Sequence, residues 1–237
     1  MDSELKQKLV HLANKYETID FLKDDPSQFM HLFHDCTKQE NAAFIAAALS
    51  YGNRKIFIPK ISLLINLYLN KEEYLPDNDM CFYRLHTNKM INRFLCVLKE
   101  INTTYGSLGQ MIKSQNIHSG IEAINFITNY FAERNASELI PKNSQSACKR
   151  VCMFLRWMVR DNSPVDLGLW SDVIDKKTLI MPMDTHVLQE AHKLGLIKSK
   201  SGSMATAIKL TNKLKVFFPD DPTRADFALF GLGVDEN

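Results

Sequence analysis

The sequence lacks long apolar runs. No stretch approaches the roughly 20 consecutive apolar residues that a membrane-spanning helix needs. Residues 1–6 alternate charged and uncharged side chains where a signal peptide would carry an apolar segment. These absences predict a cytoplasmic protein that does not interact with a membrane.

Cysteines are few and irregularly spaced. The chain has 5 cysteines, and no two of them form a CxxC pair. An odd number without a regular pattern argues against a disulfide framework and against zinc or iron–sulfur sites. The sequence therefore predicts no metal and no other cofactor. The cysteines, which we expect to be reduced, are Cys36, Cys81, Cys96, Cys148 and Cys152.

An excess of charge of either sign is also missing. The chain has 29 Lys and Arg against 27 Asp and Glu, a formal net charge of +2, so the total charge identifies no partner. A protein that docks on DNA needs to be basic on one face only. The 237 residues, 45% hydrophobic and 24% charged, are typical of a globular protein that buries a substantial core.

Helical patterns run through most of the chain. A capping box of Thr37 and Glu40 predicts a helix start, and Gly52 predicts the end of that helix. Asp221, followed by proline, predicts another start. The only strand pattern of note, residues 178–180, is short. These features predict an all-α fold of roughly ten short helices. The other predicted helices cover residues 56–68, 88–101, 121–131, 144–160 and 184–195.

Residues 139–160 form the most informative segment, because they include five basic residues and no acidic one. On a helix with 100° per residue, Lys149, Met153, Arg156 and Arg160 share one face, opposite an apolar face. A basic face beside a helix start suits a nucleic-acid phosphate backbone. The solvated face of an ordinary amphipathic helix has the same pattern, so the spacing leaves both interpretations open.

A second segment, PMDTHVLQEAHKLGL at residues 182–196, places Asp184 directly before an apolar-periodic helix. Taken alone, Asp184 is most simply the N-cap of that helix.

Together the two segments resemble the core of the helix-hairpin-helix DNA glycosylases, in which a hairpin and a lysine precede a proline–x–aspartate segment. The interval from Lys149 to Asp184 is similar to that of the archaeal 8-oxoguanine glycosylases. The chain also resembles a family of bacterial proteins without an assigned function. The stretches that carry this second resemblance are FIAAALSYGNR, YGSL, RWMVRDNSPVDLGLW, PMDTH and DPTRADFALFGLG.

The glycosylase resemblance implies a single unit, residues 1–237, made of two packed helical lobes with a cleft between them. The lobes are residues 38–180 and residues 1–37 with 181–237. The implied function is excision of an oxidised purine such as 8-oxoguanine from double-stranded DNA by a monomer, with an abasic-site lyase step. Lys149 is the implied nucleophile that forms a Schiff base, and the Asp184 carboxylate stabilises positive charge on the sugar.

A lysine in a desolvated pocket among other cations loses its proton more readily than an exposed lysine. Arg150 and Arg156 are the cations that we expect near Lys149. The resemblance also implies contacts with DNA and a pocket for the extruded base. The expected DNA contacts are Asn143, Ser144, Arg150, Arg156, Arg160, Asn53 and Arg54, the last two in a loop that would fill the gap left by the base. The expected base-pocket residues are Met153, Trp157, Trp170 and Tyr51.

Two features depart from the family pattern. No glycine occurs between Gly120 and Gly168, although the usual hairpin contains glycines that approach phosphate closely. The cysteines that hold an iron–sulfur cluster in endonuclease III are also missing.

Two other interpretations remain. In the first, the chain is a DNA-binding protein of the same fold without activity. In the second, it is an all-α metal-dependent phosphohydrolase. The second would use His31, His34 and Asp35, with Asp184 and His186 as further ligands.

Overall fold

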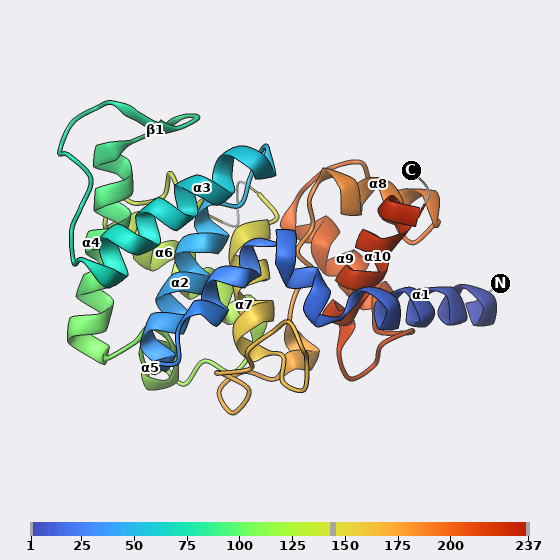
Figure 1. Ribbon diagram of the computed structural model, residues 1–237. Helices are drawn as coiled ribbons and strands as arrows, with labels where there is room; N and C mark the ends of the chain where they lie inside the picture. Colours follow the sequence, from blue (N-terminus) through green and yellow to red (C-terminus); the bar gives the residue numbers. More distant parts are fainter. Residues whose placement is uncertain (1, 143–145, 236–237) are drawn as a thin grey trace.

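The computed structural model describes residues 2–142 and 146–235, and most of them are helical (Figure 1), which confirms the predicted all-α class. The first α-helices are α1 (Asp2–Tyr16), α2 (Cys36–Leu49), α3 (Arg54–Ile65), α4 (Asn88–Tyr105) and α5 (Leu108–Ser114). They are followed by α6 (Gly120–Glu133), α7 (Lys149–Val159), α8 (Thr185–Lys193), α9 (Met204–Leu214) and α10 (Ala225–Asp235).

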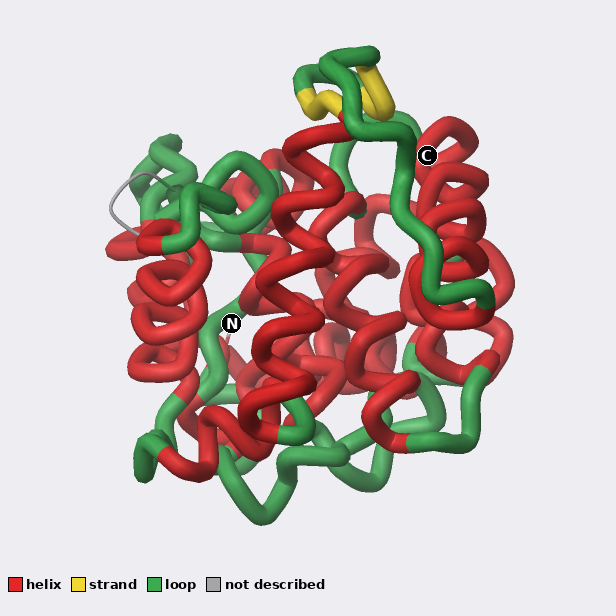
Figure 2. Tube along the Cα trace, turned by 90° about the vertical axis from the view of Figure 1, so that its left-hand side faces the viewer, coloured by secondary structure: helices red, strands yellow, loops and turns green. Residues whose placement is uncertain are grey.

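Short elements connect these helices. The 3-10 helices are η1 (Ile19–Asp24), η2 (Pro26–Leu32), η4 (Lys176–Thr178) and η5 (Pro222–Arg224), and a π-helix, η3 (Asn66–Asn70), extends α3. The strands β1 (Cys81–Tyr83) and β2 (His86–Thr87) form a small antiparallel hairpin at one end of the helices (Figure 2).

Helix α7 lies between two groups of helices (Figure 1). On one side α7 packs against α2 and α6, and α2 packs against α3. On the other side α1 packs against α10, and α10 packs against α8. The two ends of the chain lie on this second side (Figure 1). Segments from both ends of the sequence therefore meet beside α7.

Helix α2 forms the centre of the core. Every residue from Glu40 to Leu49 is buried, because the alanines allow neighbouring helices to approach from all sides. The Phe44 ring packs against Phe94, Phe131 and Phe154, at centroid distances of 5.5, 5.3 and 4.7 Å. This aromatic cluster joins α2, α4, α6 and α7.

Side-chain caps explain where most of these helices begin. The residue before each of seven α-helices accepts a backbone N–H of the first turn, which satisfies a donor that has no partner within the helix. The seven residues are Asp35, Asn53, Thr87, Ser107, Ser119, Asp184 and Ser203. The predicted N-cap role of Asp184 is thus confirmed.

Several local predictions were wrong. Asp35, not Thr37, caps α2, and the Glu40 carboxylate instead accepts N–H groups from Leu108 and Gly109 at the start of α5. Asp221 makes no cap hydrogen bond. Residues 178–180, a short strand candidate in the sequence, form no strand and belong in part to η4, and β1 and β2 were missed because each has at most 3 residues.

None of the helices in the described ranges combines the length and apolar character needed to cross a lipid bilayer.

The aromatic cluster should dominate stability. We expect Phe44→Ala to lower the free energy of unfolding by about 3–5 kcal/mol, because it leaves a cavity among four helices. Urea denaturation followed by circular dichroism measures this change. Leu85→Ala, at a side chain that is 87% exposed, is the control and should shift stability by no more than about 0.5 kcal/mol. Similar losses in both variants would contradict this description of the core.

Candidate active site

Lys149 and Asp184 lie together. The Nζ atom of Lys149 is 3.3 Å from the Oδ2 atom of Asp184, and the two side chains are 33% and 40% exposed. Lys149 is the first residue of α7 and Asp184 directly precedes α8, so two helix N-termini meet at this pair. An amine and a carboxylate at this separation can exchange a proton, and solvent reaches both.

The two oxygens of Asp184 have different partners. Oδ1 accepts the backbone N–H of Val187 at 2.9 Å and caps α8, while Oδ2 faces Lys149. Burial raises the pKa of Asp184, but the positive charge of Lys149 and the Val187 N–H oppose it and hold the pKa below its ordinary value. The carboxylate is therefore ionised at neutral pH.

The start of α7 differs from those of the seven capped helices. Its N-cap residue, Cys148, has a left-handed backbone with a φ of 48° and makes no side-chain cap hydrogen bond. Left-handed geometry is uncommon for a residue other than glycine, and it turns the chain sharply into the helix. The first turn of α7 thus lacks the side-chain acceptor that the seven capped helices have.

A cavity of about 470 Å³ opens at the Lys149–Asp184 pair. Arg150 forms part of its wall; its Nη1 donates to the carbonyl of Ala48 at 2.9 Å, and its guanidinium lies 5.1 Å from the centre of the Tyr51 ring. The C-terminal end of α2 and the N-terminal end of α7 are joined by this contact. The residues lining the cavity are Ser50, Tyr51, Pro141, Ser146, Ala147, Cys148, Lys149, Arg150, Val151, Met183, Asp184, Thr185, Leu188, Lys200 and Gly202.

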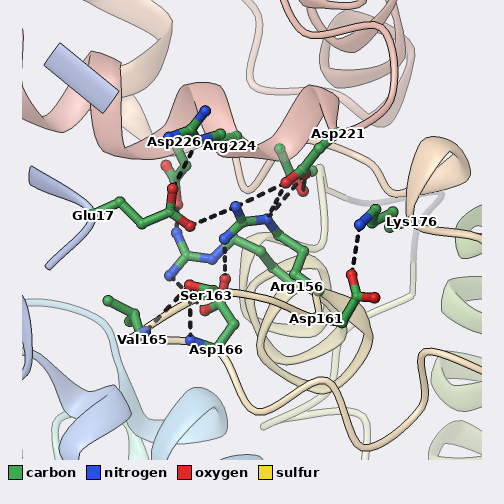
Figure 3. Close-up of polar contacts among 12 residues, drawn as sticks. Glu17, Arg156, Asp161, Ser163, Val165, Asp166, Lys176, Asp221, Arg224 and Asp226 are labelled. Carbon is green, nitrogen blue, oxygen red and sulfur yellow. Dashed lines mark hydrogen bonds and ion pairs between the residues drawn. The ribbon is translucent and has the colours of Figure 1, made fainter. Parts of the chain in front are cut away.

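Arg156 and Arg160 do not face solvent, and this corrects the predicted basic surface and the predicted contacts of both residues with DNA. Their side chains are only 3% and 2% exposed. Figure 3 shows the carboxylates that surround them. Arg156 pairs with Asp166 and Asp226, while Arg160 pairs with Asp166, with Glu17 at 2.7 Å and with Asp221 at 2.8 Å. Buried guanidinium groups require such partners.

This buried ion cluster extends toward the site through Asp226. Burial raises the pKa of Asp226 to about 6, the positive charge of Arg156 opposes that rise, and the negative charge of Asp184 adds to it. Asp226 is thus close enough to the Lys149–Asp184 pair to sense its charge.

Of the predicted base-pocket residues, the structure places one at the cavity and the others in the core. Tyr51 lines the cavity. Met153 and Trp157 are 8% and 0% exposed and belong to the hydrophobic core, so their assignment to the pocket was wrong. Trp170 was also misassigned, since it is buried and its Nε1 donates to Glu40 at 2.8 Å. The aromatic residues that follow Lys149 in the sequence therefore pack in the hydrophobic core and do not line the cavity.

The other predicted DNA contacts lie in two places. Asn143 and Ser144 fall outside the described residues. Asn53 caps α3 through its side chain, and Arg54 is 46% exposed, 3.8 Å from Asp25. Both are exposed, Asn53 directly before α3 and Arg54 as the first residue of α3.

The residues proposed for the metal-dependent alternative have other contacts. His31 Nε2 bonds to the carbonyl of Val165 at 2.8 Å, and Asp35 caps α2. Within residues 2–142 and 146–235, no group of three or more His, Cys, Asp and Glu side chains has the geometry of a metal site.

Sequence reasoning missed the segment after α8 that contributes to the cavity. Lys200 and Gly202 line it, together with Thr185 and Leu188 of α8. A signal was present, because residues 191–219 contain six lysines and no acidic residue. Only the folded chain brings that segment to Lys149.

Comparison with known proteins gives one match. A family model described as "Protein of unknown function (DUF2400)" matches residues 25–235. Neither the curated proteins nor the solved structures gave a significant match.

The raised pKa of Asp226 predicts that the free energy of unfolding depends on pH. With a folded-state pKa of about 6 against an ordinary value of 3.8, the folded state holds a proton that the unfolded state has lost. Ionisation of Asp226 therefore destabilises the fold as the pH rises from about 4 to about 6. Whatever constant cost follows from loss of the charged partner of Arg156, the stability of Asp226→Asn relative to the wild type should increase as the pH rises across this range, measured by urea denaturation at several pH values. A difference that does not change with pH would contradict the assignment.

Proposed function

The chain belongs to the DUF2400 family, and from the geometry of its site we propose that it is a DNA glycosylase with an abasic-site lyase step. The observation that carries the proposal is the separation of 3.3 Å between Lys149 Nζ and Asp184 Oδ2 at the opening of a cavity. A volume of about 470 Å³ lies in the usual range for small-molecule sites, which is the space an extruded nucleotide requires.

The residue types suit base excision. In the proposed reaction the Asp184 carboxylate takes a proton from the Lys149 ammonium group and passes it to the departing base, so that Asp184 is ionised again while it faces the sugar. The Lys149 amine forms a bond to C1′ as the bond between C1′ and the base nitrogen breaks, and the base leaves with that electron pair and takes up a proton. The bond between C1′ and the ring oxygen O4′ then breaks, O4′ takes a proton from the Lys149 nitrogen, and a protonated Schiff base between Lys149 and C1′ remains. Asp184 stabilises the positive charge that develops on the sugar.

The surroundings of the pair support a nucleotide ligand. The first turn of α7, without a side-chain cap, offers backbone N–H groups and the positive end of the helix dipole to a phosphate. Arg150 adds a positive charge, and the Tyr51 ring offers an aromatic face on which a base can stack.

The proposed fold is that of the helix-hairpin-helix glycosylases, with lobes of residues 38–180 and of residues 1–37 with 181–237. The cavity fits this division, because Tyr51, Lys149 and Arg150 come from one part while Asp184, Thr185 and Lys200 come from the other. An oxidised purine such as 8-oxoguanine in double-stranded DNA is the proposed substrate, and the proposed active form is a monomer in the cytoplasm.

Borohydride trapping tests the nucleophile. With a duplex containing 8-oxoguanine, the wild type should form a covalent adduct with DNA, because borohydride reduces a Schiff base to a stable amine. Lys149→Ala should form none. Lys142→Ala is the matched control, since this exposed lysine stands seven residues before Lys149, and it should trap like the wild type. An adduct of equal yield with Lys149→Ala would move the nucleophile elsewhere, and a duplex that is bound but never cut or trapped by the wild type would favour a protein that only binds DNA.

Substitution of Asp184 separates capping from chemistry. Asn caps helices about as well as Asp, so Asp184→Asn should change the free energy of unfolding by less than about 1 kcal/mol. Loss of the negative charge should nevertheless slow excision by about 10²–10³-fold in single-turnover assays. Asp35→Asn, at the cap of α2, makes the same change away from the cavity and should leave excision unaffected. A large loss of stability in Asp184→Asn would reduce the role of Asp184 to capping.

A further inference from the structure

Residues 191–219 form a basic segment that the proposed chemistry does not use. It covers the end of α8, the following loop and α9, and it contains six lysines and no acidic residue. The chain has 29 basic and 27 acidic residues in total, so a run of this length without a carboxylate is a marked local imbalance.

Most of these lysines have no carboxylate partner. Lys198, Lys200, Lys209 and Lys213 are exposed, and none of them forms an ion pair with a described residue. Lys193 differs, since it pairs with Glu190 at 2.7 Å. Several exposed lysines elsewhere do have carboxylate partners, namely Lys23, Lys89, Lys113 and Lys177. The segment therefore presents uncompensated positive charge.

The lysines line cavities that continue from the candidate site. A second cavity, of about 430 Å³, shares Thr185, Leu188 and Lys200 with the cavity at Lys149. A third, of about 600 Å³, shares Ser199 with the second. Because each cavity shares lining residues with the next, the three are neighbours along the path from the Lys149–Asp184 pair to α9, and together they are called the groove.

The second and third cavities combine apolar side chains with lysines that have no carboxylate beside them in the lining. Neither the second nor the third cavity is lined by an Asp or Glu residue. In the third, Lys209 and Lys213 stand four residues apart on the same face of α9, and Lys198 lines the same space from the preceding loop. Serine, threonine and asparagine side chains supply neutral hydrogen-bond donors beside these ammonium groups.

A ligand for this groove carries repeated negative charge along its length. A phosphodiester backbone has this property, and lysines without protein partners bind it by releasing its counterions. A single phosphate or carboxylate would engage only one part of the groove. The connection to the Lys149–Asp184 cavity further favours a polymer that occupies both places together.

We propose that the groove formed by Lys198, Lys200, Lys209 and Lys213 binds the DNA backbone beside the nucleotide held at Lys149. The inference rests on the proposed function for the identity of the polymer. It assigns DNA affinity to residues 198–213, in place of the buried Arg156 and Arg160. The backbone contacts there are independent of base sequence and position the duplex, whereas Lys149 and Asp184 act on the extruded nucleotide.

A triple variant, Lys198→Gln with Lys209→Gln and Lys213→Gln, tests the proposal. These side chains are exposed and outside the cavity at Lys149, so folding and chemistry should be unaffected. Binding of an undamaged duplex is measured by fluorescence anisotropy at several KCl concentrations. Affinity should fall at least about 10-fold near 0.1 M salt, and the slope of log K against log salt should become less negative by roughly 2–3. The rate of excision at saturating protein should match the wild type.

The control replaces Lys6, Lys38 and Lys71, three exposed lysines outside the groove, with glutamine and should keep the wild-type affinity and slope. Equal losses in both triple variants, or none in the groove variant, would overturn the proposal. So would a wild type that binds vesicles of anionic lipid but no duplex. Loss of duplex binding in the groove variant would support DNA binding by the groove even if borohydride trapped no adduct, because binding of an undamaged duplex does not depend on a Schiff base.

Discussion

Arg156 and Arg160 extend from α7 into carboxylates supplied by distant parts of the sequence, Glu17 near one end and Asp221 and Asp226 near the other. A guanidinium group without a partner is very costly to bury, and removal of one partner from such a pair typically costs about 3–5 kcal/mol. These contacts therefore fix α7 against η5 and α10. Because Arg156 stands about two turns from Lys149 on the same helix, the cluster also fixes the position of the Lys149 backbone at the start of α7.

The site combines features that each have an ordinary structural explanation. An aspartate that caps a helix is common, as is a lysine at the start of an amphipathic helix. Their meeting at a cavity is less common, since it requires α7 and α8 to begin at the same place. Cys148, with its left-handed backbone, leaves the start of α7 without a side-chain cap. The cavity at Lys149 shares residues with the next cavity beyond α8, so the lysines of that segment lie near the pair.

The sequence predicted much of the helical framework, because apolar periodicity and capping residues are local signals. Asp184 was recognised as a cap, and the helices near residues 56, 88 and 121 were found. The basic face of α7 was misread, since a solvated face and a face buried against carboxylates have the same pattern; the partners of Arg160 include Glu17, 143 residues away. Tyr51 and Lys200, which both line the cavity, come from segments far apart in the sequence, so residue spacing alone could not show that they lie together.

The central claim is that Lys149 and Asp184 face an extruded nucleotide. A crystal structure of the Lys149→Gln variant with a duplex containing 8-oxoguanine tests it most directly, since this variant keeps the length of the side chain but has no nucleophilic amine. In this complex the damaged nucleotide should leave the base stack and occupy the cavity between residue 149 and Asp184, with its C1′ atom facing both side chains. A fully stacked duplex, or one bound on a different face with this cavity empty, would contradict it.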